Sequence, residues 1–161
     1  MANNYNRIAI ITGTTSGIGE ATMRRFVADG FGVVGNGRNA EKLAVLENEM
    51  GPGFCSIVGN AADNAILEKL FAIAKDRFGR EADIVVANAG RGLGGSVKDA
   101  DLTQFEDVLK INVIGALALI QKAAQKMVDI QKKAFPQSAA DIVIIGSTAG
   151  RQVSPFSAVY S

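Results

Sequence analysis

The glycine-rich segment 12–19 is the first part of the sequence whose residue types and spacing point to chemistry. It follows an apolar run and precedes a helical pattern, which is the context of a dinucleotide-binding turn. Gly13 permits a tight turn, Gly17 lets the backbone approach a pyrophosphate, and Gly19 permits close packing of the helix. The helix N-terminus offers unpaired N–H groups and the positive end of a dipole. Three hydroxyl side chains add hydrogen-bond donors for a phosphate: Thr14, Thr15 and Ser16.

The spacing of these glycines leaves alternatives open. They follow the pattern Gly-x₃-Gly-x-Gly rather than the Gly-x-Gly-x-x-Gly of the standard dinucleotide fingerprint. A turn that binds nothing can have the same composition, and methyltransferases that use S-adenosylmethionine carry a glycine-rich first turn on a similar sheet. The segment by itself predicts a nucleotide site without identifying the nucleotide.

The turn after the second apolar run, residues 35–39, contains an arginine and no carboxylate. An acidic residue here would bind the ribose hydroxyl of NAD, whereas an arginine accommodates the 2′-phosphate of NADP. Arg38 could pair with that phosphate and stack on adenine, and Asn36 and Asn39 could add hydrogen bonds. The turn therefore predicts NADP, the alternative being that Arg38 is a solvated loop residue.

Catalysis in this chain must proceed without histidine, because the sequence has none. This excludes Ser-His-Asp and Cys-His catalysis and histidine metal ligands. Tyr160 is a candidate proton donor, provided that a nearby cation lowers the pKa of its phenol from about 10. Ser147 follows the fifth apolar run, where an open α/β sheet places its ligands. The alternatives are that Ser147 caps a turn and that Tyr160 is a packing aromatic.

Composition narrows the class of protein further. Lys and Arg number 17 and Asp and Glu 16 among 161 residues, a net charge of +1, so neither nucleic acid nor an anionic membrane is an expected partner. The single cysteine, Cys55, excludes an intrachain disulfide and a cysteine cluster for zinc, and is expected in the core. The apolar stretches are too short to span a bilayer. The start does not resemble a signal peptide, so a cytoplasmic location is expected.

The arrangement of elements predicts an α/β fold. Helical patterns alternate with apolar, Val/Ile-rich runs that read as strands buried on both faces. These runs are Ile8–Ile11, Phe31–Val34, Phe54–Val58, Ile84–Ala87 and Ile142–Ile145. The helices are expected after the glycine-rich turn, over 40–50, over 64–78 and over 102–132. The stripe expected to face inward in the first helix is Ile18, Thr22 and Phe26, and that in the last is Phe105, Leu109, Asn112, Ala116, Leu119, Ala123 and Met127. We therefore predict a Rossmann-type, doubly wound parallel sheet of three layers, forming a single dinucleotide-binding domain over residues 1–161.

Several motifs resemble those of the short-chain dehydrogenase/reductase family over nearly the whole chain, from about residue 7. The segment 12–19 matches the family's cofactor turn, Ile18 included, and explains the unusual glycine spacing. Asn88-Ala89-Gly90 matches a motif that supports the sheet beside the cofactor, and Asn112 matches an active-site asparagine. Ser147 and Tyr160 match the catalytic serine and tyrosine.

The resemblance implies an oxidoreductase that transfers hydride between NADP(H) and a carbonyl or alcohol substrate. Tyr160 would be the general acid or base, Ser147 would bind the substrate oxygen, and Asn112 would hold a water in a proton relay. Asn112 also falls on the apolar stripe of its helix, so a purely structural hydrogen bond remains an alternative. Cofactor contacts are expected from Gly13, Thr15, Ser16, Gly17, Ile18, Gly19, Arg38, Asn60, Ala61, Asn88, Ala89 and Gly90. Asn60 replaces an aspartate common in the family.

The chain departs from the family pattern at its end, one residue after Tyr160. The family carries a lysine four positions after the tyrosine, which binds the ribose and lowers the pKa of the phenol. We therefore expect a truncated sequence, and a homo-oligomer when full length. The competing hypothesis is a non-catalytic module that binds nucleotide or a partner. Apolar lining for the substrate is expected from Leu93, Val153 and Phe156, and the substrate itself is not predicted.

Overall fold

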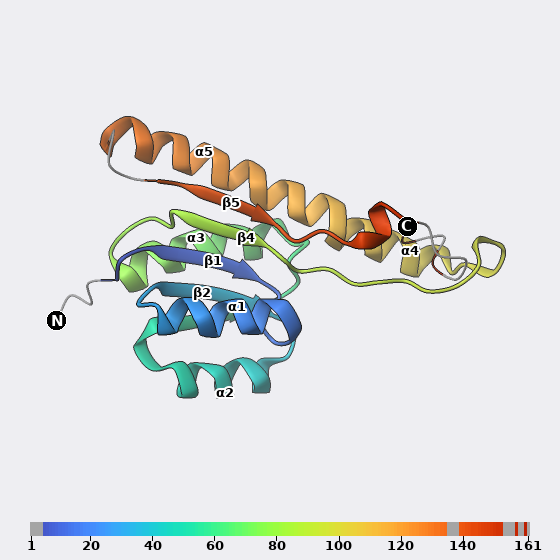
Figure 1. Ribbon diagram of the computed structural model, residues 1–161, viewed down its shortest axis with the longest axis horizontal. Helices are drawn as coiled ribbons and strands as arrows, with labels where there is room; N and C mark the ends of the chain where they lie inside the picture. Colours follow the sequence, from blue (N-terminus) through green and yellow to red (C-terminus); the bar gives the residue numbers. More distant parts are fainter. Residues whose placement is uncertain (1–4, 135–138, 153–156, 158–159, 161) are drawn as a thin grey trace.

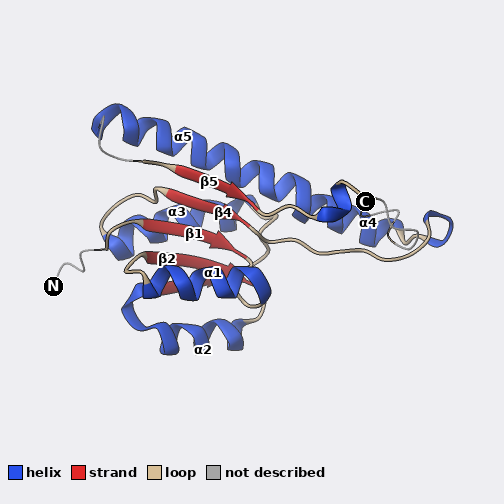
Figure 2. Cartoon of the chain, viewed as in Figure 1, coloured by secondary structure: helices blue, strands red, loops and turns tan. Residues whose placement is uncertain are grey.

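A parallel sheet with helices on both faces makes up the structure, a computed structural model that describes residues 5–134, 139–152, 157 and 160 (Figure 1). The strand order is β3-β2-β1-β4-β5, and all five strands point the same way (Figure 2). The strands are β1 Ile8–Thr12, β2 Gly32–Gly37, β3 Phe54–Val58, β4 Ile84–Ala87 and β5 Asp141–Ile144. The helices are α1 Gly17–Ala28, α2 Ala40–Met50, α3 Asn64–Phe78, α4 Leu102–Leu109 and α5 Ala116–Ala134. The predicted Rossmann-type α/β fold is confirmed.

Two apolar clusters fill the space between the three layers. On β1, Ile8 and Ile10 pack with residues of α3 and α5, whereas Ala9 and Ile11 pack with residues of α1 and α2. Because successive side chains of a strand point to opposite faces, an unbroken apolar run serves both clusters. This is why β1 carries no polar residue before Thr12.

The strand order reverses beside β1, and this determines where a ligand can bind. The chain builds β1, β2 and β3 in one direction, then returns through α3 to place β4 on the other side of β1. The loops after β1 and β4 therefore leave the sheet in opposite directions and open a crevice at its carboxyl edge.

Local signals account for the ends of two helices. The Asp63 side chain accepts a hydrogen bond from Ala65 N (2.8 Å) at the start of α3, and α3 ends at Gly79 with φ +74°. The Asn39 side chain accepts from Lys42 N (2.9 Å) at the start of α2. Such caps satisfy backbone groups that the helix leaves unpaired. The predicted limits of both helices are confirmed.

The predicted helix over 102–132 is divided by a π-helical segment, residues 110–115. The buried residue before this segment is Val108, not the predicted Leu109, which is 42% exposed. After the segment the predicted stripe holds, since Leu119, Ala123 and Met127 are buried. A π turn inserts an extra residue, so one period of 3.6 cannot be continued through it.

The inward face of α1 also differs from the stripe that the sequence predicts. Ile18 is 60% exposed, whereas Gly19 and Met23 are buried. The face turned inward begins with a glycine, which contributes no hydrophobic signal to the pattern. The predicted stripe was therefore wrong at Ile18 and right at Phe26, which packs against the buried cluster on this face of the sheet.

Strand β5 is exposed along its whole length, whereas β1, β2 and β4 are buried and β3 is partly buried. Its residues Ile142, Val143 and Ile144 are 37%, 42% and 60% exposed. Among the described strands β5 pairs with β4 alone.

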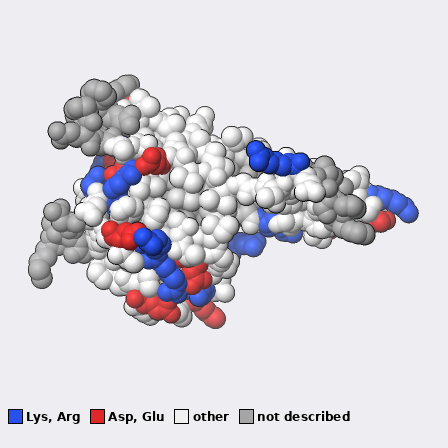
Figure 3. Space-filling view, in the orientation of Figure 1, with Lys and Arg blue, Asp and Glu red and all other residues white. Residues whose placement is uncertain are grey.

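Charged side chains of both signs lie mainly over α1 and α2 in Figure 3, and the middle of that face is uncharged.

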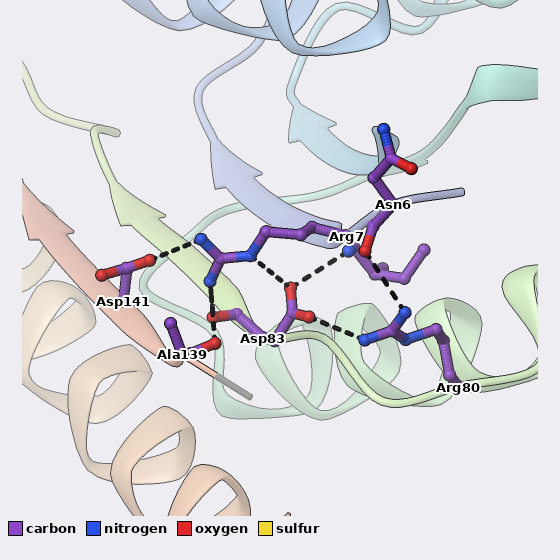
Figure 4. A network of polar contacts seen from close by, with 7 residues as sticks. Asn6, Arg7, Arg80, Asp83, Ala139 and Asp141 are labelled. Carbon is purple, nitrogen blue, oxygen red and sulfur yellow. Dashed lines mark hydrogen bonds and ion pairs between the residues drawn. The ribbon is translucent and has the colours of Figure 1, made fainter. Parts of the chain in front are cut away.

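A polar network ties three strands together at the end of the sheet opposite the crevice (Figure 4). The buried Asp83 carboxylate accepts from Ile8 N (3.1 Å) and from the Arg80 guanidinium (2.8 Å), and pairs with Arg7 Nε (3.4 Å). Arg7 also reaches the Asp141 carboxylate (2.7 Å). The network therefore joins the starts of β1, β4 and β5.

Replacing Asp83 with Asn is expected to lower the free energy of unfolding by about 3 kcal/mol, because it leaves two arginines without their buried anion. The Asp83 side chain is only 6% exposed, whereas that of Asp141 is 52% exposed. Asp141→Asn is therefore the matched control, with an expected loss below about 1 kcal/mol. Urea unfolding of the two variants measures both values, and equal small losses would contradict the assigned role of Asp83.

Candidate active site

A cleft of about 600 Å³ opens at the carboxyl edge of the sheet. It is lined by the glycine-rich turn, the ends of β2, β4 and β5, and the π-helical segment. Most residues that the sequence singles out line it: Gly13, Thr15, Ser16, Ile18, Arg38, Ala61, Asn88, Ala89, Gly90, Asn112, Ser147 and Tyr160. Three others, Gly17, Gly19 and Asn60, do not belong to the lining.

The glycines of the turn 12–19 occupy three different environments. Gly13 and Gly17 have φ of +75° and +56°, values that favour glycine. Space around Gly17 is open, with no atom within 4 Å of a Cβ built there. Gly19 is packed so closely that a Cβ would overlap with Gly13 O and with the side-chain nitrogen of Asn88. This glycine brings the N-terminus of α1 against the turn itself.

The N-terminus of α1 is free to receive an anion. Ser16 is the N-cap residue, and its side chain makes no capping hydrogen bond. Backbone N–H groups of the first turn therefore keep their capacity to donate. Thr14 differs from its prediction, because it is buried and its hydroxyl donates to Asn36 O (3.2 Å). Of the three predicted hydroxyl donors, only those of Thr15 and Ser16 line the cleft.

Asn88 joins the ends of β1 and β4. Its side-chain amide donates to Thr12 O (2.8 Å) and Gly13 O (3.3 Å). The Thr12 hydroxyl in turn accepts from Asn88 N (3.1 Å) and Ala89 N (3.0 Å). These bonds hold the glycine-rich turn against the loop after β4, so Asn88 supports the site as well as lining it.

The two asparagines near the end of β2 already bind groups of the protein. Asn36 lies in β2, is buried, lines the cleft, accepts from Gly13 N (3.2 Å) and donates to Gly59 O (3.0 Å). Asn39 does not belong to the lining, and its side chain caps α2. A cofactor contact from Asn36 stays a prediction, whereas the position of Asn39 does not favour one. Arg38 is exposed, lines the cleft and makes no hydrogen bond or ion pair with the described residues.

Asn112 lies in the π-helical segment and binds the backbone of Arg91 at both ends of its amide. Its Oδ1 accepts from Arg91 N (2.9 Å), and its Nδ2 donates to Arg91 O (2.9 Å). Three residues further on, a Cβ on Gly115 would meet Ala61 O at 2.7 Å. The segment therefore contacts the loops after both β4 and β3.

Ser147 and Tyr160 both line the cleft near the end of β5. The Ser147 hydroxyl accepts from Ala149 N (3.1 Å), as a turn cap does, and keeps its own hydrogen for donation. Tyr160 is half-buried, and its N–H donates to Ser157 O (2.9 Å).

Asn60, the predicted cofactor contact after β3, uses its side-chain oxygen to accept from Ala62 N (3.0 Å).

The remaining candidates lie elsewhere. Leu93 is half-buried and does not line the cleft, and Val153 and Phe156 lie outside the described residues. Burial raises the pKa of the Cys55 thiol to about 12, so this residue is a neutral thiol at pH 7. Over the described ranges there is no cluster of potential metal ligands, and no helix there has the length and apolarity to cross a membrane.

Among the residues to which the sequence assigns no role of their own, two polar ones matter for the cleft, Thr12 through its hydrogen bonds and Arg91 through its place in the lining. Thr12 holds the loop after β4, and Arg91 lines the cleft directly after Asn88-Ala89-Gly90. A signal for Arg91 was present, because it stands at the carboxyl end of a predicted strand. A threonine at the end of a strand, such as Thr12, does not by itself indicate a ligand site in the way that a charged residue does.

Comparison with known proteins agrees with this geometry. The family model described as short chain dehydrogenase matches residues 7–161. A serine 3-dehydrogenase of Agrobacterium fabrum is 41% identical over 109 residues, 67% of this chain and 43% of the relative. An uncharacterized oxidoreductase of Staphylococcus aureus is 31% identical over 157 residues, 97% of this chain and 64% of the relative.

Solved structures give the same result. A 3-ketoacyl-(acyl-carrier-protein) reductase from Brucella melitensis, complexed with NADH, has a TM-score of 0.88 at 25% identity, over 97% of this chain and 63% of that one. The closed form of a serine dehydrogenase complexed with NADP+ has a TM-score of 0.83 at 29% identity. The match covers 95% of this chain and 59% of that protein's chain. The chain spans less than two thirds of the length of each of these proteins. With the family model matching nearly every residue and the fold and motifs in agreement, this chain belongs to the short-chain dehydrogenase family.

Proposed function

We propose that the protein is an oxidoreductase that transfers hydride between NADP(H) and a carbonyl or alcohol substrate. The observation that carries this proposal is the single cleft that brings an uncapped helix N-terminus together with Asn112, Ser147 and Tyr160. When bound, the nicotinamide would supply or accept the hydride. The protein would supply position, hydrogen bonds and a proton.

The chain's own residues take distinct roles in this mechanism. For carbonyl reduction, Tyr160 donates its phenolic proton to the substrate oxygen, and Ser147 donates a hydrogen bond to the same atom. For alcohol oxidation, Tyr160 accepts the proton. Asn112 holds the backbone of Arg91, and the second hydrogen of its amide is available to a water of a proton relay.

The residues of the cleft fit a dinucleotide with a 2′-phosphate. The N–H groups at the start of α1 suit the pyrophosphate, with Thr15 and Ser16 beside them. At the end of β2, Arg38 suits the 2′-phosphate, since the lining includes no carboxylate. Ile18, Ala61, Ala89 and Gly90 supply uncharged surface for the rest of the cofactor. Gly17, Gly19, Asn60 and Asn88 would act by shaping or supporting these loops.

Replacing Arg38 with Asp is expected to weaken NADPH binding by about 100-fold or more and NADH binding by less than threefold. Removal of a charge-assisted contact costs about 1.5–3 kcal/mol, and the new carboxylate repels the 2′-phosphate. Fluorescence titration with each cofactor measures both dissociation constants. Equal losses for NADPH and NADH would contradict the preference for NADP.

The first test of the proposal is an assay of the complete protein for oxidation of NADPH with a panel of aldehydes and ketones. Turnover with any member supports the reaction class. Tight binding of NADPH without turnover across the panel would favour a nucleotide-binding module. Tight binding of S-adenosylmethionine but not of NADPH would favour a methyltransferase.

We also propose that residues 1–161 belong to a single domain and that the complete protein is a cytoplasmic homo-oligomer. Support for self-association comes from exposed apolar side chains on α4, the π-helical segment and the start of α5: Leu109, Val113, Ile114 and Leu117. Exposed apolar residues grouped on neighbouring turns are typical of an interface. Light scattering of the complete protein would measure its mass in solution.

A further inference from the structure

The charge of the cleft is concentrated at two arginines. Among the described lining residues the charged ones are Arg38, after β2, and Arg91, after β4. No carboxylate lines the cleft with them. Strands β2 and β4 flank β1 on opposite sides, so the ends of the two strands lie about 10 Å apart. The two arginines therefore enter the cleft from strands on opposite sides of β1.

The position of Arg91 is fixed by the site itself. Both its N–H and its C=O are hydrogen-bonded to the Asn112 amide at 2.9 Å. A Cβ on the preceding Gly90 would lie 3.2 Å from Asn112 Oδ1, so the two segments are in close contact. The backbone of Arg91, and with it the start of its side chain, is thus held where the loop after β4 contacts the π-helical segment that carries Asn112.

The guanidinium of Arg91 is available to a ligand. The residue is half-buried, and its side chain makes no hydrogen bond or ion pair with the described residues. A partly desolvated cation without an anionic partner is unfavourable. The planar guanidinium can donate two parallel hydrogen bonds to one carboxylate. An anionic ligand would therefore be bound here more strongly than a neutral one.

The anionic groups of NADP already have places on the other side of the cleft. The N-terminus of α1 fits the pyrophosphate and Arg38 fits the 2′-phosphate. Arg91 instead binds Asn112 through its backbone and follows β4, the strand next to β5, which leads to Ser147. The anion that Arg91 fits is consequently one carried by the substrate.

We propose that Arg91 binds a carboxylate of the substrate, which makes the substrates oxo acids and the corresponding hydroxy acids. This inference rests on the proposed function. In reduction, the carbonyl carbon accepts a hydride from NADPH and the carbonyl oxygen accepts a proton from Tyr160. The products are a hydroxy acid and NADP+, and the carboxylate is unchanged throughout.

The test compares aliphatic 2-, 3- and 4-oxo acids with their methyl esters as substrates of the complete protein with NADPH. The unsubstituted protein is expected to prefer an acid over its own ester by at least about tenfold in kcat/KM, the size of one charge-assisted contact. Arg91→Leu is expected to abolish this preference, with the dissociation constant of NADPH changed less than about twofold. Arg91→Lys is expected to retain part of the preference.

A matched control removes an arginine outside the cleft. Arg77 is exposed near the end of α3, and Arg77→Leu is expected to keep the full preference for acids. The Arg91 variants keep the backbone atoms that Asn112 binds, so they are expected to fold, and Arg91→Lys provides a second, conservative probe.

Four outcomes would overturn the inference. A preference for acids that survives in Arg91→Leu would show that another group binds the carboxylate. A loss confined to NADPH affinity would assign Arg91 to the cofactor. Turnover of neutral ketones and esters without any preference for acids would refute the inference and leave the proposed reaction intact. Failure to oxidise NADPH with any carbonyl, neutral ones included, would refute the proposed function and the inference together.

Discussion

Replacing Tyr160 with Phe is expected to lower kcat for carbonyl reduction by about 10²–10⁴-fold, the usual contribution of a positioned general acid. The change removes one hydroxyl and keeps the aromatic ring. Tyr160 is half-buried in the wall of the cleft, which Ser147 also lines. A loss of proton donation should therefore reduce kcat and leave the dissociation constant of NADPH nearly unchanged. Steady-state kinetics together with cofactor titration measure both quantities.

The other tyrosine of the chain provides the control for this prediction. Tyr5 packs its ring edge-on against Phe78, with the ring centroids 5.0 Å apart, next to the start of β1 and far from the cleft. Tyr5→Phe is expected to leave kcat unchanged. A Tyr160→Phe variant that turns over as fast as the unsubstituted protein would show that the proton comes from another donor.

Replacing Gly19 with Ala is expected to weaken NADPH binding by about 100-fold or more. The new methyl group would overlap with Gly13 O, a backbone atom that cannot rotate away, and with the Asn88 amide. Relief requires the N-terminus of α1 to move away from the turn, and displacement of binding groups by about 1 Å has effects of this size. Fluorescence titration measures the affinity, and thermal unfolding measures the accompanying loss of stability.

A glycine outside the site provides a control that separates the effect of a substitution on NADPH binding from its effect on the stability of the fold. Gly79 ends α3 with φ +74°, and no atom lies within 4 Å of a Cβ built there. Gly79→Ala is expected to cost about 1 kcal/mol of stability through backbone strain alone, with no change in NADPH affinity. If Gly19→Ala bound NADPH normally, the close contact of α1 with the turn would not be what forms the phosphate site.

Local sequence patterns predicted the five strands in their order and several helix limits correctly. They were wrong at the end of β2, which extends to Gly37 into the predicted turn, and in predicting a buried β5, which is exposed. The apolar runs that became β1 and β4 are buried on both faces, and the cap of α3 at Asp63 and its end at Gly79 lie where expected. Each of these features depends on residues within a few positions of one another. The stripes of α1 and α4 were misplaced because a glycine and a π turn determine their inward faces, and neither changes the hydrophobic pattern.

The sequence by itself determined the order of the elements, the glycine-rich turn and the identities of the candidate side chains at the strand ends. Only the tertiary structure decided which of these side chains are free to bind a ligand. The Asn36 side chain is engaged by Gly13 and Gly59, and that of Asn112 by the backbone of Arg91. The guanidinium groups of Arg38 and of Arg91, which the sequence did not single out, make no hydrogen bond or ion pair with the described residues. The physical reason is that propensity and periodicity are local, while the partner of a buried polar group comes from a distant segment that folding places beside it.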